Sequence, residues 1–367
     1  MVVRAALLRQ PNTALEIVAL DLDGPKAGEV LVQIRAAGVC HSDWHLVTGD
    51  TRHPLPVVIG HEGAGVVEAV GPGVARLKPG DRVALNWAPS CGACFYCQRG
   101  RPNLCDTYVG PIWAGTMLDG TTRLTERGNP VFHYCGLACF AEYTVVPAVS
   151  CVPVPAELPF EIAAVIGCAV TTGVGSVLNT AQVEAGSSVA VFGVGGVGLS
   201  TVMGARLAGA ETIIAIDPLE TRRTAALDLG ATHALEPSAD AHEAIKELTV
   251  GRGVDYAFEA AGIPAVQETC FAATRPGGTV VFSGLAPMGS ATNIPGAILV
   301  REEKSVKGSY YGTANPAVDF ILYAEMYAQG RLPLDRLISQ TYALKEINEA
   351  FGDMLSGATR RGVVVFG

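Results

Sequence analysis

The sequence predicts an α/β protein with two domains, a β-rich domain followed by a doubly wound parallel sheet. Its 367 residues, of which 49% are hydrophobic, are enough for two separate cores. Short apolar runs separated by turn residues fill the first ninety positions, which is typical of a β-rich domain. In the second half, apolar runs alternate with helical patterns, which is typical of a parallel sheet covered by helices.

The β-rich domain is predicted from three apolar runs and the turns between them. The runs are Glu29–Arg35, Gly65–Val70 and Asp81–Leu85, and the segments Gly71–Gly73 and Lys78–Asp81 supply turn residues. Because no long amphipathic helix interrupts these runs, we expect strands joined by short loops.

The parallel sheet is predicted around a strand, a glycine-rich turn and a helix. The apolar run Ser188–Phe192 leads into Gly193–Gly198, whose sequence is Gly-Val-Gly-Gly-Val-Gly. A helical pattern follows over 199–208, and a second apolar run, Thr212–Ile216, ends at Asp217, nineteen residues beyond the turn. A glycine-rich turn alone is a weak signal, because such turns have other uses. Here the strand, the helix and the acidic residue all lie where a dinucleotide site needs them.

Each position of this motif has a physical role in binding a dinucleotide. Gly193 permits the tight turn, Gly195 lets the backbone approach the pyrophosphate, and Gly198 lets the helix pack closely on the strand. The pyrophosphate then lies at the helix N-terminus, where backbone N–H groups are free to bind it. The Asp217 carboxylate accepts hydrogen bonds from the adenosine ribose and repels a 2′-phosphate, so we expect NAD rather than NADP.

Further apolar runs continue the alternation of strands and helices. They lie at 227–234, Val254–Glu259 and Gly277–Gly284. The apolar run Thr292–Val300 is predicted to be an edge segment of the sheet, and an uncovered edge invites pairing with another chain.

Four of the ten cysteines are clustered at Cys91, Cys94, Cys97 and Cys105. Four thiolates on a short loop suit a closed tetrahedral zinc site, which would hold together a lobe that cannot pack alone. The alternatives are a redox pair and an iron–sulfur cluster.

A second group of possible zinc ligands is spread along the chain. Cys40, His61 and Cys168 would form a three-ligand site whose fourth position is open, which is typical of catalytic zinc. Spacing alone is a modest signal, because cysteine is often a small buried apolar residue and a lone histidine is usually a core or surface residue.

Charge and composition exclude several classes of partner. The net charge is −9 and no basic cluster is present, which argues against nucleic acid and against acidic membrane surfaces. We see no apolar run near 18 residues and no signal peptide, so we expect a cytoplasmic protein with reduced thiols.

Taken together, these motifs resemble those of zinc-dependent alcohol dehydrogenases of the medium-chain dehydrogenase/reductase superfamily, over essentially the whole chain. They include Gly38–Asp43, Gly60–Gly65, the four-cysteine lobe, 167–173 and 193–217. The resemblance implies a GroES-like catalytic domain built from 1–170 and 311–367, and a Rossmann domain over 171–310. It further implies NAD, two zinc ions per subunit, an alcohol or aldehyde substrate, and a homodimer or homotetramer.

The resemblance also assigns roles to individual residues. It makes Cys40, His61 and Cys168 the ligands of a catalytic zinc, and the four clustered cysteines those of a structural zinc. Asp43 matches a carboxylate that orients the histidine ligand, and Glu62 an acid behind the zinc.

Four residues beyond the glycine motif match cofactor contacts: His41 and Arg361 at the pyrophosphate, Arg222 beside the adenosine ribose, and Thr172 beside the nicotinamide. Ser42 would accept the proton of the alcohol and pass it through the ribose to His45 and solvent. The substrate pocket would be lined by large apolar or aromatic residues, namely Trp87, Tyr134, Leu285 and Tyr310. We therefore expect aromatic or medium-chain primary alcohols as substrates.

Several alternatives remain open at this point. The segments Met117–Arg123 and Arg127–Gly128, in the loop 106–140, resemble the nicotinoprotein branch, which retains NAD through turnover and uses an external electron acceptor. Arg52 and His53 leave open a thiol-adduct formaldehyde dehydrogenase. A non-catalytic protein that binds NAD and zinc is the remaining alternative, because a fold does not prove an activity.

Overall fold

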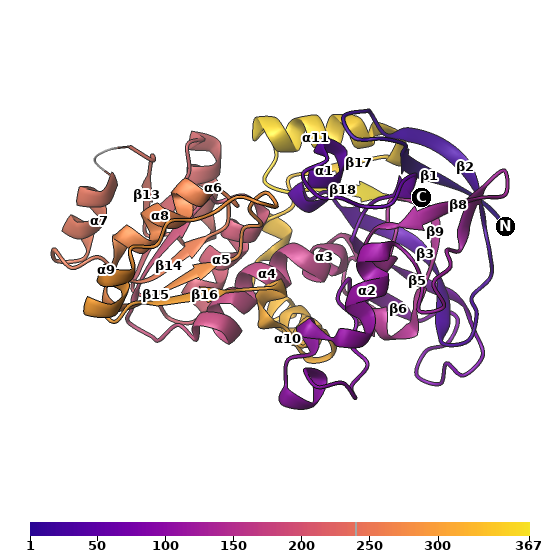
Figure 1. Cartoon of the computed structure of the whole chain (residues 1–367), viewed down its shortest axis with the longest axis horizontal. Coiled ribbons are helices and arrows are strands. Elements are labelled where there is room, and N and C mark those ends of the chain that lie inside the picture. The colour runs from indigo at the N-terminus through magenta and orange to yellow at the C-terminus, as the bar shows by residue number, and fades with distance from the viewer. Residues whose placement is uncertain (239–240) are drawn as a thin grey trace. The chain divides into compact units, whose positions relative to one another are not determined.

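The computed structural model describes residues 1–238 and 241–367. It divides into two compact units, and both chain termini belong to the first (Figure 1). The first unit contains Met1–Cys168, Asn315–Gly330 and Ile338–Gly367, and the second contains Ala169–Ala314 and Arg331–Leu337. The short segment Arg331–Leu337 therefore groups with the second unit, whereas we expected it in the first domain.

The first unit is rich in antiparallel β-structure, as the alternating apolar runs indicate. A closed barrel has the strand order β1 (Val2–Leu8), β2 (Glu16–Leu22), β7 (Leu124–Glu126), β8 (Asn129–His133) and β4 (Val57–Val58). A seven-stranded sheet has the order β10 (Cys151–Pro153), β6 (Arg82–Leu85), β5 (Glu62–Val70), β3 (Glu29–Gly38), β18 (Gly362–Val365) and β17 (Gln340–Tyr342), and β9 (Tyr143–Pro147) also pairs with β3.

The three predicted strands of this unit are present; two are longer than expected, and the third, β6, is one residue shorter. The run Glu29–Arg35 became β3, and Gly65–Val70 became the second part of β5. At the far end of the chain, β18 pairs antiparallel with the end of β3, with Val363 opposite Gly38. Residues from both ends of the sequence therefore complete one sheet.

Helices of the first unit are short and connect these strands. They are α1 (His41–Thr48), α2 (Asp106–Ala114), α3 (Phe160–Val165), α10 (Pro316–Ala328) and α11 (Ile347–Ser356). The loop 106–140, to which we assigned no structure, contains α2 and the hairpin formed by β7 and β8.

The second unit is a doubly wound parallel sheet, as predicted. The six strands have the order β13 (His233–Leu235), β12 (Thr212–Ile216), β11 (Ser188–Phe192), β14 (Val254–Glu259), β15 (Thr274–Phe282) and β16 (Ser305–Gly308), and every pairing is parallel. Its helices are α4 (Thr171–Gly175), α5 (Gly196–Leu207), α6 (Glu220–Leu229), α7 (Ala241–Leu248), α8 (Pro264–Ala273) and α9 (Gly296–Arg301).

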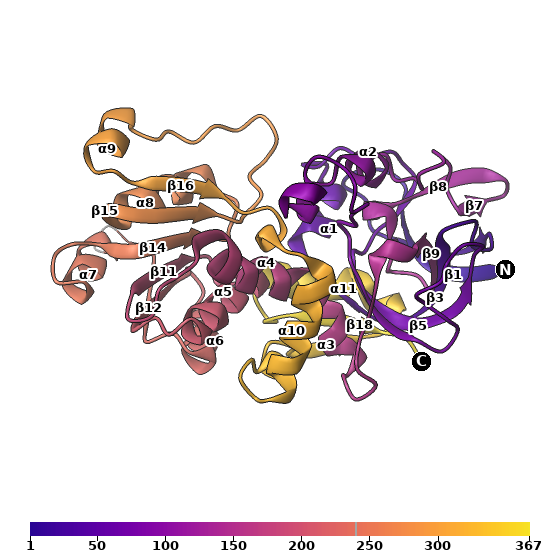
Figure 2. The same cartoon turned by 90° about the horizontal axis from the view of Figure 1, so that it is seen from below.

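The prediction that Thr292–Val300 forms an edge segment of the sheet was wrong. Residues Gly296–Arg301 form α9, and the edge strand of the sheet is β16, beyond which α9 lies (Figure 2). The apolar character of the run has another cause, because Ile294 and Leu299 pack against the core of the sheet. Pro295 immediately precedes α9, where it favours a helix start.

The expectation that no apolar run approaches 18 residues was also too strong. The helical stretch Phe160–Ala181 has 22 residues and a mean hydropathy of 1.7 over its most apolar window. It is the one stretch of this kind in the residues that the structure describes, and 89% of that window is buried inside the protein, as in the core helix of a globular fold.

Candidate functional site

Three elements of the first unit bring together the predicted ligands of a reactive metal. Cys40 lies between β3 and α1, His61 immediately precedes β5, and Cys168 lies in the π-helical turn Ile166–Val170. Ligand atoms of these three residues and of Glu62 all lie within 4.8 Å of one another. All four residues are buried, so the donors face one another away from solvent.

The hydrogen bonds of His61 leave one of its ring nitrogens able to bind a metal. Its Nδ1 lies 3.0 Å from Asp43 Oδ1, which also accepts a hydrogen bond from the Gly60 N–H at 2.9 Å. Among the described residues, the buried Nε2 of His61 has no hydrogen-bond partner. A carboxylate on Nδ1 fixes the proton there and leaves the Nε2 lone pair for a metal, so the donor set suits zinc.

The two thiols of this cluster differ in acidity. A hydrogen bond between them lowers the pKa of Cys40 well below the usual value and raises that of Cys168. One thiolate therefore forms readily, and a divalent cation would be needed to keep both thiols ionised in the same buried space.

Glu62 and Arg361 form a buried ion pair that sequence analysis did not foresee. The Arg361 guanidinium, 5% exposed, contacts the Glu62 carboxylate across 299 positions of the chain. Burial raises the pKa of Glu62 to about 7, although the Arg361 charge acts in the opposite direction. Arg361 thus lies beside the donor cluster of Cys40, His61, Glu62 and Cys168, which we call the reactive cluster. Its contact with the pyrophosphate stays a prediction.

The four-cysteine lobe also forms a compact donor cluster. The sulfur atoms of Cys91, Cys94, Cys97 and Cys105 lie within 4.8 Å of one another. Backbone N–H groups donate to two of them, with Cys91 N–H 3.3 Å from Cys105 Sγ and Cys94 N–H 3.3 Å from Cys91 Sγ.

These contacts favour thiolates in the lobe, but unequally. Hydrogen bonds from Thr107 and from two backbone N–H groups lower the pKa of Cys91 to about 6. Burial and the neighbouring thiols raise the pKa of Cys97 to about 12. A dication would bring all four thiols to the ionised state, and four donors leave no open position, so the lobe fits a structural zinc.

The glycine-rich turn of the second unit has the geometry that a dinucleotide needs. Gly193 has φ +82°, in the left-handed region that favours glycine, and a Cβ on Gly198 would lie 1.9 Å from the Gly193 carbonyl oxygen. A Cβ on Gly195 would meet nothing within 4 Å. Gly195 therefore borders open space immediately before the N-terminus of α5, where a pyrophosphate would bind.

Asp217 follows β12 and lies beside this turn. It is 2% exposed, and its two carboxylate oxygens accept hydrogen bonds from the N–H groups of Val194 and Leu219, each at 3.0 Å. Arg222 Nη1 lies 3.8 Å from the same carboxylate. Since each oxygen has a second lone pair, Asp217 retains acceptor capacity for a ribose.

Replacing Asp217 with Gly should raise the KM for NAD about tenfold or more and relax the exclusion of NADP, because hydrogen bonds to a charged acceptor are lost. Steady-state kinetics with both cofactors measure the effect. Asp217→Asn is the matched control, since it keeps an oxygen for the turn but removes the charge, and it should mainly improve NADP. Unchanged KM values for both cofactors in Asp217→Gly would contradict the assignment.

The proposed proton-transfer residues lie on one helix. Ser42 and His45 are three positions apart on α1, which places them on neighbouring turns, and both are half-buried. Sequence analysis missed Asp50, whose Oδ2 lies 3.4 Å from His45 Nδ1 and accepts a hydrogen bond from Thr48 Oγ1 at 2.6 Å. Its only sequence signal is an acidic residue just beyond the helix C-terminus.

The remaining predicted residues are divided between the two units. Trp87 and Tyr134 lie edge-on to the His61 ring, with centroid distances of 6.4 and 5.5 Å. Leu285 and Tyr310, in the second unit, are 54% and 38% exposed. Of the other two predicted cofactor contacts, His41 is the exposed first residue of α1 and Thr172 lies in α4 with 8% exposure.

Comparisons with known proteins cover the whole chain. Residues 26–156 match the family described as alcohol dehydrogenase GroES-like domain, and residues 196–325 match zinc-binding dehydrogenase. The sequence is 42% identical to the NDMA-dependent alcohol dehydrogenase of Amycolatopsis methanolica, with 100% of this chain and 99% of that protein aligned. It is 37% identical to the S-(hydroxymethyl)glutathione dehydrogenase of Paracoccus denitrificans, over 99% of both. The crystal structure of benzyl alcohol dehydrogenase from Acinetobacter calcoaceticus superimposes with a TM-score of 0.95 at 32% identity, covering 100% of both chains.

Proposed function

Because the chain belongs to the zinc-dependent alcohol dehydrogenases of the medium-chain dehydrogenase/reductase superfamily, we propose that its preferred substrates are aromatic or medium-chain primary alcohols and their aldehydes. The enzyme transfers hydride between alcohol and NAD. The observation that carries the proposal is the buried cluster of Cys40, His61 and Cys168. Within the described part of the chain, His61 Nε2 has no hydrogen-bond partner, and two aromatic rings lie against the same imidazole.

Cys40, His61 and Cys168 would hold the catalytic zinc, and Asp43 would orient His61. Zinc bound there supplies a Lewis acid that makes the alcohol proton easier to remove. Glu62, paired with Arg361, would lie behind this site with its charge balanced by the guanidinium.

Ser42 would take the proton from the alcohol, and His45 would release it to solvent. His45 is 25% exposed and sits one helical turn beyond Ser42, so it can exchange protons with water. The Thr48 hydroxyl lowers the pKa of Asp50, which stays ionised and can hold His45 by its Nδ1. The His45 ring is thereby oriented with Nε2 as the exchanging atom.

The preference for apolar alcohols rests on the residues that surround His61. Trp87 and Tyr134 are 8% and 3% exposed, so both present apolar ring surface inside the protein. Burial of apolar surface contributes about 25 cal/mol per Å², or about 0.8 kcal/mol per methylene, which is several-fold in kcat/KM per carbon. A contribution of Leu285 and Tyr310, which belong to the second unit, stays a prediction.

Retention of NAD through turnover is a second candidate. Two observations support it: the 42% identity to a relative named NDMA-dependent alcohol dehydrogenase, and the segment Met117–Arg123 in the loop 106–140. In this form the enzyme would pass electrons to an external acceptor instead of releasing NADH.

One panel of substrates separates these possibilities. We expect kcat/KM to rise from ethanol to hexanol and benzyl alcohol, measured with added NAD and, in parallel, with NDMA and no added NAD. A ranking with ethanol highest would refute the apolar preference. Turnover with NDMA alone would favour retained NAD, and S-(hydroxymethyl)glutathione as the best substrate would favour the thiol-adduct alternative.

We also propose a homodimer or homotetramer in the cytoplasm. The edge strand β16 supports pairing of subunits, because its four residues are exposed and it has a partner strand on one side only. Light scattering distinguishes either oligomer from a 38.1 kDa monomer.

A further inference from the structure

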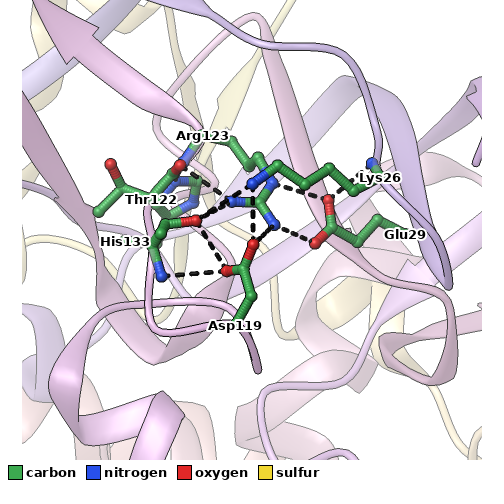
Figure 3. A network of polar contacts seen from close by, with 7 residues as sticks. Lys26, Glu29, Asp119, Thr122, Arg123 and His133 are labelled. Atoms are coloured by element: carbon green, nitrogen blue, oxygen red, sulfur yellow. Dashed lines mark hydrogen bonds and ion pairs between the residues drawn. The ribbon is translucent and has the colours of Figure 1, made fainter.

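A buried arginine lies in the loop 106–140, immediately before β7. Arg123 is 1% exposed, and its guanidinium donates hydrogen bonds to four residues (Figure 3). Nε and Nη2 donate to the two carboxylate oxygens of Glu29 at 2.8 and 2.5 Å, and Nη2 also donates to Asp119 at 3.0 Å. Nη1 donates to the Thr121 hydroxyl at 2.6 Å and to the Thr122 carbonyl at 3.0 Å. All three nitrogen atoms of the guanidinium are therefore used.

The charges around Arg123 are balanced. Lys26 contacts Asp119 at 2.8 Å, so two carboxylates face two cations. A buried ion pair contributes little net stability compared with apolar residues of the same size, because desolvation offsets the attraction. A bidentate guanidinium does, however, fix the geometry of the groups that it joins. The network is therefore better suited to holding this segment in one conformation than to stabilising the fold.

Contacts within and after the β7–β8 hairpin connect Arg123 to the reactive cluster. The Arg123 backbone N–H donates to His133 Nε2 at 3.1 Å, so this buried imidazole must be neutral with its proton on Nδ1. His133 is the last residue of β8, and Tyr134 follows it directly. The Tyr134 hydroxyl donates to the Ser42 carbonyl at 3.2 Å, and its ring lies edge-on to His61.

The backbone that follows Tyr134 is strained and held at its far end. Cys135 and Ala138 have φ values of +54° and +56°, in the left-handed region that residues with a Cβ rarely adopt. The Cys139 N–H then donates to the Gly60 carbonyl at 2.8 Å, next to His61. Such a conformation persists only when contacts on both sides enforce it, and the Arg123 network supplies the contacts on the N-terminal side.

We propose that Arg123 is a positioning residue that sets substrate specificity, because it fixes His133 and thereby places Tyr134 beside the reactive cluster. This inference rests on the proposed function, in which Tyr134 lines the substrate pocket. Arg123 itself touches neither substrate nor cofactor in this role.

The test compares Arg123→Met with Arg9→Met. Arg9 binds Glu126 of the same hairpin at 2.8 and 2.9 Å, but it is 37% exposed, and its other side-chain partner is Glu16 rather than a residue of the His133–Tyr134 segment. We expect Arg123→Met to reduce the ratio of kcat/KM for benzyl alcohol to that for ethanol by about tenfold or more, mainly through the KM for benzyl alcohol. Arg9→Met should keep the wild-type ratio, and both variants should retain two zinc ions per subunit.

A second pair of variants keeps the test decisive if Arg123→Met does not fold. His133→Gln retains an acceptor for the Arg123 N–H, whereas His133→Phe removes it, so the ratio should fall in His133→Phe and be largely preserved in His133→Gln. An unchanged ratio in a folded Arg123→Met or in His133→Phe would overturn the inference. Failure of the proposed preference is distinguishable, since it would show as ethanol ranked highest by the wild-type enzyme, whatever the variants do.

Discussion

Replacing Cys168 with Ser is expected to lower kcat by about a thousandfold while leaving the unfolding temperature nearly unchanged. Cys168 supplies one of three donors in the buried cluster with Cys40 and His61, and a serine hydroxyl is a poor zinc ligand at neutral pH. Lewis-acid catalysis contributes several kcal/mol to such reactions, and about 4 kcal/mol corresponds to about three powers of ten in rate. The fold should persist because the four-cysteine lobe is untouched.

Metal analysis and steady-state kinetics on the purified variant measure this effect. We expect the zinc content to fall from two ions per subunit toward one, in parallel with kcat. Cys151→Ser is the matched control, since Cys151 is also a buried free thiol but lies outside both donor clusters. A Cys168→Ser enzyme that lost one zinc yet kept wild-type kcat would refute the role of this cluster.

Replacing Cys97 with Ser should have the opposite effect. We expect a large loss of stability, while the fraction of protein that remains folded keeps the wild-type kcat. Binding of structural zinc contributes about 10–16 kcal/mol to the folding of small zinc peptides. Even a loss of about 4 kcal/mol would lower the unfolding temperature of a domain of this size by about 10 °C. The lobe around Cys91–Cys105 contains few buried side chains of its own, so little else can compensate.

Calorimetry combined with zinc analysis tests the second prediction. Gln98→Ala, an exposed change on the same lobe, should behave as the wild type. If Cys97→Ser lost one zinc ion but unfolded at the wild-type temperature, the lobe would not be a structural site.

Three strands of the second unit could be predicted to the residue. The runs Ser188–Phe192, Thr212–Ile216 and Val254–Glu259 coincide with β11, β12 and β14. Strands of a parallel sheet are buried on both faces, so they appear as uninterrupted apolar runs with clear ends. The glycine motif was equally clear, because its positions follow from local backbone geometry.

Features that depend on distant side chains could not be predicted. The pairing of Glu62 with Arg361 joins residues 299 positions apart, and Arg123 meets Glu29 across 94 positions. A charged residue considered alone in the sequence indicates a solvated surface, so neither buried pair could be foreseen. The run Thr292–Val300 failed for a related reason, since apolar residues that pack a helix on the core are indistinguishable locally from an edge strand.

The pairing of β18 with β3 constrains the order in which the protein can be assembled during synthesis. The sheet of the first unit pairs residues 363–365 with residues 36–38, and Arg361 can reach Glu62 only once it has been synthesised. Residues 169–314, the larger segment of the second unit, are available earlier. Domains begin to fold as they emerge from the ribosome, so the nascent chain can assemble this parallel sheet while β3 still lacks β18. The reactive cluster therefore acquires its full surroundings only after residues 361–365 have been synthesised.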